Sequence, residues 1–252
     1  MIDTHTHFLP GLDDGPATLE ESLALIRAAA ANGITAMVAT PHANHQYEFD
    51  AGRTAAALAE VRAASDAGVA LYSGCEVHLS AQNIERVLRD PRPYAMNQAG
   101  YLLVEFSDFA IPPAASDIFT RLMDAGVRPV IAHPERNALL RADTARLRAW
   151  VAQGAVLQIT ASSLFERFGK AARASSIELL RLGLVQLVSS DAHDTVHRPP
   201  ELAEAREFVN RRFGDEMAEE LFVRNPAAVV AGDHIGPPPA PRPRRRWLPF
   251  WS

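Results

Sequence analysis

Short apolar runs rich in β-branched residues alternate along the chain with longer segments whose apolar positions recur at helical spacing. The apolar runs predict strands at residues 2–7, 34–41, 69–77, 101–106, 128–133, 155–161 and 185–190. The longer segments predict helices at residues 18–32, 52–67, 81–89, 114–125, 143–153, 173–182, 201–213 and 215–223. Because strands and helices take turns, we expect parallel pairing through right-handed crossovers.

Several predicted helix ends carry recognisable capping residues. Thr18 and Glu21 have the spacing of a capping box at a helix start. Four pairs that end in glycine are typical of helix stops: Asn32-Gly33, Ala67-Gly68, Ala125-Gly126 and Leu182-Gly183.

The predicted strands end in side chains that can bind a metal ion or a phosphate group. The first strand carries His5 and His7, whose spacing places both imidazoles on one side of an extended chain. Later strand ends are Thr40-Pro41-His42, Gly74-Cys75-Glu76, Val104-Glu105-Phe106, Ala132-His133-Pro134-Glu135-Arg136 and Ser190-Asp191-Ala192-His193. A (β/α) barrel gathers all of these ends around one mouth, whereas an open sheet gathers only those near its switch point. The number of such ends favours a barrel.

Each of these residues also has a structural interpretation. A single His42 or His133 is more often a structural residue than a ligand, and a buried Glu76 or Glu105 requires a cation or an arginine nearby. Asp191 and His193 repeat the one-residue spacing of the first strand, so the whole set favours a metal centre. His45, His78 and His197 lie near these positions but off the pattern, and His234 is expected to be exposed.

Composition narrows the classes of protein that fit. With 252 residues, 48% of them hydrophobic, the chain can bury a sizeable core. Its single cysteine, Cys75, suits a reducing compartment, and Ala81 stands where a cysteine-based phosphatase would need an arginine. No apolar run predicts a membrane span or a signal peptide, so we expect a cytoplasmic protein. The net charge is −5 although the last 18 residues carry four arginines and no acid, and an acidic body argues against nucleic-acid binding.

The motifs resemble those of the PHP (polymerase and histidinol phosphatase) superfamily. The similarity rests on His5 and His7, Leu9-Pro-Gly-Leu-Asp-Asp-Gly15, Ala39-Thr-Pro-His42, Gly74-Cys-Glu76, Leu103-Val-Glu105, Ala132-His-Pro-Glu-Arg-Asn137, Ser190-Asp-Ala-His193 and Arg198-Pro. Within that superfamily, the chain is most similar to the manganese-dependent protein-tyrosine phosphatases of bacterial capsule and exopolysaccharide loci. The resemblance runs from Met1 to about Ala231.

This resemblance implies a single-domain α/β protein, a distorted seven-stranded TIM-like (β/α) barrel over residues 1–234 with up to three metal ions at its mouth. The implied ligand sets are His5, His7, Glu76 and Asp191 for the first ion, and Glu76, Glu105 and His133 for the second. The third set is His42, His193 and one of Asp13 and Asp14, of which Asp14 is favoured. Arg136 and Arg198 match the family's phosphate-binding positions.

Two features depart from the family pattern. His78 stands where an arginine is expected, among the residues that contact substrate. The segment 235–252, rich in proline, arginine and tryptophan, lies outside the family pattern and is expected to be disordered. Its basic and aromatic residues are typical either of a solvated tail or of a contact with an anionic membrane. Such a contact would place the protein at the inner face of the membrane.

The donor set favours manganese, with iron or zinc as alternatives. Paired cations lower the pKa of a bridging water and clamp the oxygens of an in-line displacement, which suits a phosphate monoester. A phenolate leaving group needs little protonation, and His78 or His197 could supply a proton if one is needed.

The favoured function is hydrolysis of phosphotyrosine on proteins, with a membrane-anchored bacterial tyrosine kinase as the implied partner. One alternative is a PHP-type phosphatase of a small metabolite, such as histidinol phosphate, or a phosphodiesterase. Another is a non-catalytic protein that docks a kinase, which the complete ligand set argues against. The sequence leaves the oligomeric state open.

Overall fold

The computed structural model describes residues 1–236, and residues 237–252, which hold most of the predicted tail, lie outside the described part of the chain. The strands are β1 (Ile2–Thr6), β2 (Ala36–Ala39), β3 (His42–Ala43), β4 (Ala70–Ser73), β5 (Glu76–His78), β6 (Tyr101–Glu105), β7 (Arg128–Ala132), β8 (Val156–Thr160) and β9 (Leu187–Ser189). The α-helices are α1 (Leu19–Ala31), α2 (Ala51–Ala64), α3 (Ala81–Arg89), α4 (Ala115–Asp124), α5 (Ala138–Arg141), α6 (Thr144–Gln153), α7 (Gly169–Arg181), α8 (Ala203–Phe213), α9 (Asp215–Glu219) and α10 (Asn225–Ala231). Short 3₁₀ segments cover Met96–Gln98 and Ala161–Phe165, and a π-helical turn covers Glu220–Arg224.

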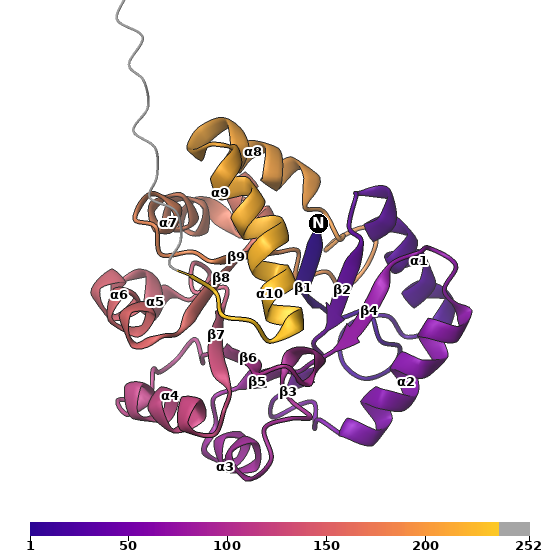
Figure 1. Ribbon diagram of the computed structural model, residues 1–252, viewed down its shortest axis with the longest axis horizontal. Helices are drawn as coiled ribbons and strands as arrows, with labels where there is room; N and C mark the ends of the chain where they lie inside the picture. Colours follow the sequence, from indigo (N-terminus) through magenta and orange to yellow (C-terminus); the bar gives the residue numbers. More distant parts are fainter. Residues whose placement is uncertain (237–252) are drawn as a thin grey trace, which may run out of the picture.

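Every strand pair described is parallel, as the alternation of strands and helices predicted. One sheet has the order β1-β2-β4 and the other has the order β3-β5-β6-β7-β8-β9. The two sheets meet beside β1 and β9, where Thr6 forms a parallel bridge with Ala192. Figure 1 shows the strands at the centre, with the helices arranged around them.

Two predicted strands are interrupted, so the described residues form nine strands in two sheets, where seven strands were expected. The segment 34–41 forms only β2, and its last residues, Thr40 and Pro41, lead into β3. The segment 69–77 divides into β4 and β5 at Gly74 and Cys75. Pro41 has no amide hydrogen to donate to a ladder, and its carbonyl instead accepts from the amide of Glu76 at 3.0 Å. Beyond the interruptions, His42 and Glu76 lie opposite each other in the parallel pair of β3 and β5.

Helix ends follow the predicted caps in some places and not in others. The capping box of Thr18 and Glu21 is present at the start of α1. Helix α2 stops at Ala64, three residues before the predicted stop, because Ser65 already has an extended backbone. Helix α7 begins at Gly169, earlier than the predicted residue 173.

Helix α10 was missed from the sequence, which placed its last helix at 215–223. Pro226 lies in the first turn of α10, where its missing amide hydrogen is tolerated. The helix lies across the amino ends of the strands in Figure 1, and Val229 and Val230 are buried there with Val38 of β2. Ile235, which the composition placed in the tail, is 5% exposed and belongs to the same cluster.

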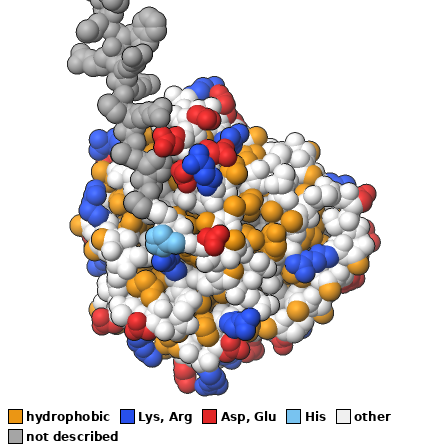
Figure 2. Space-filling view, viewed as in Figure 1, with side chains coloured by type: hydrophobic (Ala, Val, Ile, Leu, Met, Phe, Trp, Pro, Cys, Tyr) orange, Lys and Arg blue, Asp and Glu red, His pale blue; other side chains and the backbone are white. Residues whose placement is uncertain are grey.

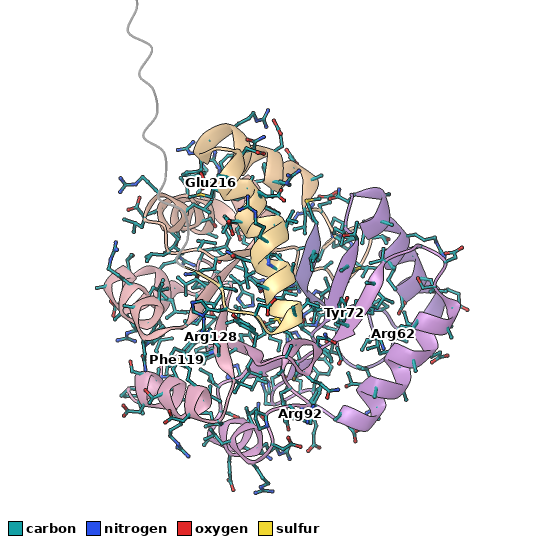
Figure 3. The ribbon with its side chains drawn as sticks, viewed as in Figure 1. Arg62, Tyr72, Arg92, Phe119, Arg128 and Glu216 are labelled. Carbon is teal, nitrogen blue, oxygen red and sulfur yellow. The ribbon has the colours of Figure 1, made fainter. Side chains whose placement is uncertain are left out.

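The face seen in Figure 2 carries acidic and basic side chains interspersed around its edge. Some of the basic side chains also support the fold: Arg62 of α2, labelled in Figure 3, donates from Nε to the carbonyl of Leu71 in β4 at 3.0 Å. Among the described residues, no helix combines the length and the apolar character that crossing a membrane requires.

Candidate metal centre

The side chains predicted at the strand ends gather at the carboxyl ends of the parallel strands. Four overlapping groups of His, Asp and Glu have ligand atoms within 4.8 Å of one another. They are His7, Asp14, His42 and His193; His5, His7 and Glu76; His5, His133 and Asp191; and His42, Glu76 and Glu105. All nine side chains of the predicted ligand set therefore occur in these groups, drawn from both sheets and from the loops that follow them.

Glu76 lies at the centre of the arrangement and is 1% exposed. Its Oε2 atom lies 3.0 Å from His42 Nδ1 and 3.3 Å from His5 Nε2, and its Oε1 atom lies 3.0 Å from His133 Nε2. Although Glu76 Oε2 and His42 Nδ1 are within ion-pair distance, both are buried and their orientation does not satisfy hydrogen-bond geometry. Leaving two such atoms without a hydrogen bond is costly unless both would bind a cation. The residues present thus fit a metal ion.

Hydrogen bonds on the outer side of the imidazoles direct their other nitrogens inward. Nδ1 of His5 lies 2.9 Å from Oε1 of Gln158, and Nδ1 of His7 lies 2.6 Å from Oδ2 of Asp13. Both oxygens are acceptors, so each Nδ1 carries a hydrogen, and each Nε2 offers a lone pair once its ring is neutral. The two Nε2 atoms are 3.3 Å apart, a spacing suited to ligands of a shared ion.

Asp13 and Asp14 have different surroundings. The Oδ1 atom of Asp14 lies 3.3 Å from Nε2 of His42 and 3.3 Å from Nε2 of His193. Asp13 instead accepts from His7 and from the backbone amide of His42 at 3.1 Å, on the outer side of the cluster. Gly15 makes this turn feasible, because a Cβ atom there would lie 2.1 Å from the carbonyl oxygen of His7.

Arg136 and Arg198 both donate to Oδ2 of Asp191. Arg198 also places Nη1 2.9 Å from Nε2 of His193, while its own Nε is buried without a hydrogen-bond partner. His133 and Asp191 have positive φ angles of 31° and 57°, which cost free energy in residues other than glycine. Both residues lie just beyond the ends of strands, and both side chains belong to the metal-competent groups.

The remaining histidines are peripheral. His78 Nδ1 lies 3.7 Å from Oε2 of Glu105, so it is beside the cluster but belongs to none of the four groups. His45, His197 and His234 are exposed.

Sequence reasoning missed two buried polar side chains that support the site. Gln158 is a polar residue inside the apolar strand β8, a position that could have marked it. Glu135 follows His133 by two residues, and its Oε1 atom accepts from the amide of Thr160 and the hydroxyl of Ser163. Glu135 thereby ties the loop after β7 to the loop after β8.

Burial and neighbouring charges shift the pKa values of the cluster residues in opposite directions. Burial acts to raise the pKa values of Glu76 and Asp191, but interactions with neighbouring groups, that with His5 foremost, hold both pKa values well below their usual range. Burial acts to lower the pKa of His7, but the Asp13 carboxylate raises it to about 9. Burial likewise acts to lower the pKa of His42, but the nearby carboxylates of Asp14 and Glu76 raise it to about 11. Without a metal ion, therefore, protons are expected on the imidazoles of His7 and His42.

Metal uptake should accordingly release protons. His7 and His42 are protonated at pH 7 in the metal-free chain, and a ligand nitrogen must be deprotonated, so binding should release about two protons at that pH. We expect the affinity for Mn²⁺ to rise as the pH increases from 6.5 to 9.5. Titration calorimetry in buffers with different ionisation enthalpies measures the proton count, and a constant affinity over this range would contradict the prediction.

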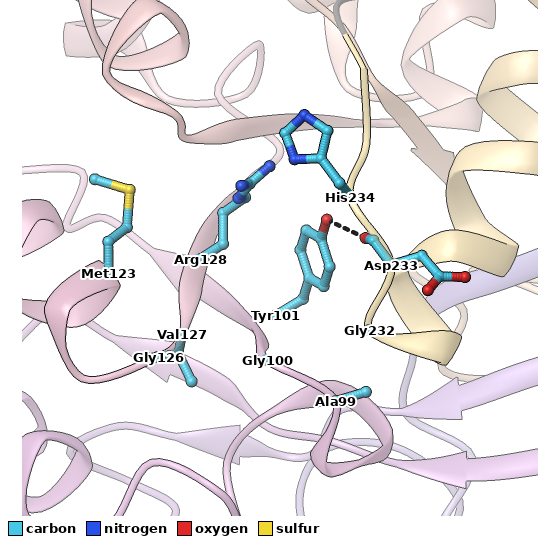
Figure 4. A pocket seen from close by; sticks show the side chains of 10 residues that line it. All are labelled: Ala99, Gly100, Tyr101, Met123, Gly126, Val127, Arg128, Gly232, Asp233 and His234. Atoms are coloured by element: carbon cyan, nitrogen blue, oxygen red, sulfur yellow. Dashed lines mark hydrogen bonds between the residues drawn. The ribbon is translucent and has the colours of Figure 1, made fainter.

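Two cavities lie at opposite ends of the strands. The larger, of about 360 Å³, opens beside Tyr101 and Arg128, the first residues of β6 and β7, as Figure 4 shows. The smaller, of about 240 Å³, is lined by Glu105 and His133 at the carboxyl ends of the same two strands, together with Arg136. Of these two cavities, the smaller adjoins the metal-competent groups, so the substrate site is assigned there despite its lesser volume.

Comparison with known proteins agrees with this geometry. The chain matches the family model described as capsular polysaccharide synthesis, CpsB/CapC, over residues 1–231. It is 34% identical to the tyrosine-protein phosphatase YwqE of Bacillus subtilis over 261 residues, which cover 100% of both chains. It is 31% identical to the tyrosine-protein phosphatase CpsB of Streptococcus agalactiae over 93% of this chain and 100% of the relative.

Comparison of the folds indicates the same family relationship. A crystal structure from work on YwqE of Bacillus subtilis and CpsB of Streptococcus pneumoniae, two metal-dependent tyrosine phosphatases, superposes with a TM-score of 0.89 and 32% identity. The superposition covers 98% of this chain and 100% of that structure. The resemblance identified from the sequence motifs is thereby confirmed, and the chain belongs to the CpsB/CapC family of capsular polysaccharide synthesis.

Proposed function

We propose that this chain is a metal-dependent phosphatase that hydrolyses phosphotyrosine on proteins of capsular or exopolysaccharide synthesis. The observation that carries the proposal is the set of four overlapping metal-competent groups beside two guanidinium groups. Relatives of 31% and 34% identity are named tyrosine-protein phosphatases. Imidazoles and carboxylates suit divalent cations, and guanidiniums suit phosphate.

Three metal ions are assigned to this cluster. The first would be held by His5, His7, Glu76 and Asp191, the second by Glu76, Glu105 and His133, and the third by Asp14, His42 and His193. The spacing of the ligand atoms supports the assignment, and the position of Asp14 between two imidazoles favours it over Asp13. The share of carboxylates favours Mn²⁺, with iron or zinc as alternatives. When bound, such ions supply an activated water and stabilise the charge on the phosphoryl oxygens.

The chain's own residues bind and orient the substrate. Arg136 and Arg198 are the substrate-binding and catalytic residues of this proposal, because their guanidiniums converge from two loops on the edge of the cluster. Both contact Asp191 through a single oxygen, so a phosphate group can replace that contact with a bidentate one. His78, 29% exposed and 3.7 Å from Oε2 of Glu105, is proposed to contact the substrate and to donate a proton to the leaving oxygen. A phenolate requires little help of that kind.

We also infer that the scaffold is a distorted seven-stranded barrel. Each interrupted strand counts once in this description, because β2 leads into β3 and β4 leads into β5 after two residues. The bridge between Thr6 and Ala192 supports closure between β1 and β9.

The partner in this proposal is a membrane-anchored bacterial tyrosine kinase that carries phosphotyrosine, reached from the cytoplasmic side. The four arginines and the tryptophans of the segment 235–252 support a peripheral contact with anionic lipid. Sedimentation with anionic vesicles, with and without residues 237–252, tests that contact, and equal sedimentation of the two forms would refute it.

One experiment tests the proposed activity. The purified full-length chain is analysed for bound metal and assayed on a phosphotyrosine peptide, on the same peptide with phosphoserine and on histidinol phosphate, before and after chelation. We expect turnover of the phosphotyrosine peptide, its loss on chelation and its recovery with Mn²⁺. Faster turnover of histidinol phosphate would favour a metabolite phosphatase. No turnover with a full metal complement would favour a docking protein.

A further inference from the structure

The cavity beside the metal-competent groups is lined by both polar and apolar side chains. Glu105, His133 and Arg136 line it together with Phe106, Leu140 and Phe168, and Asp108 and Asn137 are further polar lining residues. A phosphate ester of an aromatic ring combines the same two kinds of surface. The volume of about 240 Å³ exceeds the roughly 150 Å³ that suffices to hold a benzene molecule in a protein interior.

Phe106 and Leu140 are held in place by their neighbours. Phe106 is 5% exposed and its ring stacks on Trp150, with centroids 5.2 Å apart and an interplanar angle of 4°. Leu140 is 1% exposed and is held by the short helix α5, whose N-cap is Asn137. Asn137 also donates from Nδ2 to the carbonyl of Ser107 at 3.0 Å, which joins the loop after β6 to this wall.

Phe168 also lines the cavity and is partly exposed. The guanidinium carbon of Arg136 lies 4.1 Å from the centroid of its ring, a cation–π distance. Glu135 accepts from Thr160 and Ser163 at 2.9 and 2.7 Å, near the start of the segment that leads to Phe168. The loop after β7 therefore contacts Phe168 through Arg136 and the preceding residues of that segment through Glu135.

We propose that this cavity is a binding site for the aromatic ring of the substrate and that Phe168 is a specificity-determining residue for aryl over alkyl phosphates. The proposal rests on the proposed function, since it places the phosphate of the same substrate at Arg136 and His133. In this proposal the aromatic ring packs between Phe168 and Leu140, while the ester oxygen faces Arg136 and His133. Such aromatic packing contributes selectivity without contacting the reacting atoms.

Phe168→Leu and Phe168→Trp test the proposal in the metal-loaded full-length protein. For Phe168→Leu we expect KM for a phosphotyrosine peptide to rise about tenfold, with kcat and the inhibition constant of inorganic phosphate changed less than twofold. Phe168→Trp should restore KM. Phe165→Leu is the matched control, because Phe165 lies in the same loop but lines a different depression and packs on Phe208.

The outcomes separate the specificity role from a structural one and from the proposed function itself. If Phe168 acts only by holding Arg136, phosphate inhibition and the turnover of alkyl phosphates weaken by the same factor as turnover of phosphotyrosine, and the proposal is overturned. An unchanged KM in Phe168→Leu also overturns it while leaving the phosphatase activity established. If the unaltered protein fails to hydrolyse the phosphotyrosine peptide, the proposed function fails first.

Discussion

Glu76→Gln is expected to lower kcat/KM for a phosphotyrosine peptide by on the order of 10³-fold or more, and to reduce the metal content of the purified protein. Glutamine keeps the shape of the side chain but removes its negative charge. The change affects several ligands at once, because Oε1 of Glu76 faces His133 and Oε2 faces His5 and His42. In the proposed centre Glu76 would bind two ions, so one substitution would weaken the binding of both.

Metal analysis and kinetics measured together check this prediction, with Glu85→Gln as the control. Glu85 lies on α3, pairs with Arg89 at the surface and is 76% exposed, so its replacement should leave both quantities unchanged. Circular dichroism establishes that the variant is folded. A folded Glu76→Gln protein with full metal content and more than about a tenth of the original activity would contradict the shared-ligand assignment.

The centre could be predicted from sequence because a strand end is a local feature. His5, His7, Glu105 and His133 each lie at or just beyond the carboxyl end of a strand, and parallel pairing brings such ends together whatever the helices between them do. The predicted groups therefore depended little on accurate helix boundaries. An error of three residues at the end of α2 left the positions of these side chains unaffected.

The features that were missed depend on tertiary contacts. Gln158 reads as an isolated polar residue in an apolar strand, and its partner His5 is 153 residues away. Helix α10 was missed because its apolar residues Val229 and Val230 cover the amino ends of the strands, a surface that exists only after the sheets form. The interruptions of two strands also depend on a neighbour, since the amide of Glu76 bonds to Pro41. The spacing of apolar residues along the sequence gives no information about such distant partners.

Dependence on tertiary contacts also explains why the sequence could not show which of Asp13 and Asp14 faces the other side chains of the cluster. Adjacent residues in a turn point in different directions, and the direction is set by Gly15, whose Cα lies against the carbonyl of His7 with no room for a side chain. One carboxylate then faces His42 and His193, while the other supports His7 from outside. The two variants should therefore fail in different ways.

Asp14→Asn should remove one metal equivalent per chain and lower kcat by about a hundredfold or more, because an amide is a weak replacement for an anionic ligand. Asp13→Asn should keep the full metal stoichiometry at saturating Mn²⁺ but weaken the affinity by about 10- to 100-fold, as expected for a partner of a ligating imidazole. Asp66→Asn is the control, since the Asp66 side chain is 81% exposed.

The pH dependence separates the two roles further. The Asp13 carboxylate is what raises the pKa of His7 to about 9 against the effect of burial, so its removal lowers that pKa and lessens competition between protons and metal. The affinity of Asp13→Asn for Mn²⁺ should therefore rise less between pH 7 and 9 than that of the unaltered protein. Asp14→Asn leaves Asp13 and His7 in place, and its remaining metal sites should retain the full pH dependence. Loss of a metal equivalent in Asp13→Asn, with full occupancy in Asp14→Asn, would reverse the assignment of the two carboxylates.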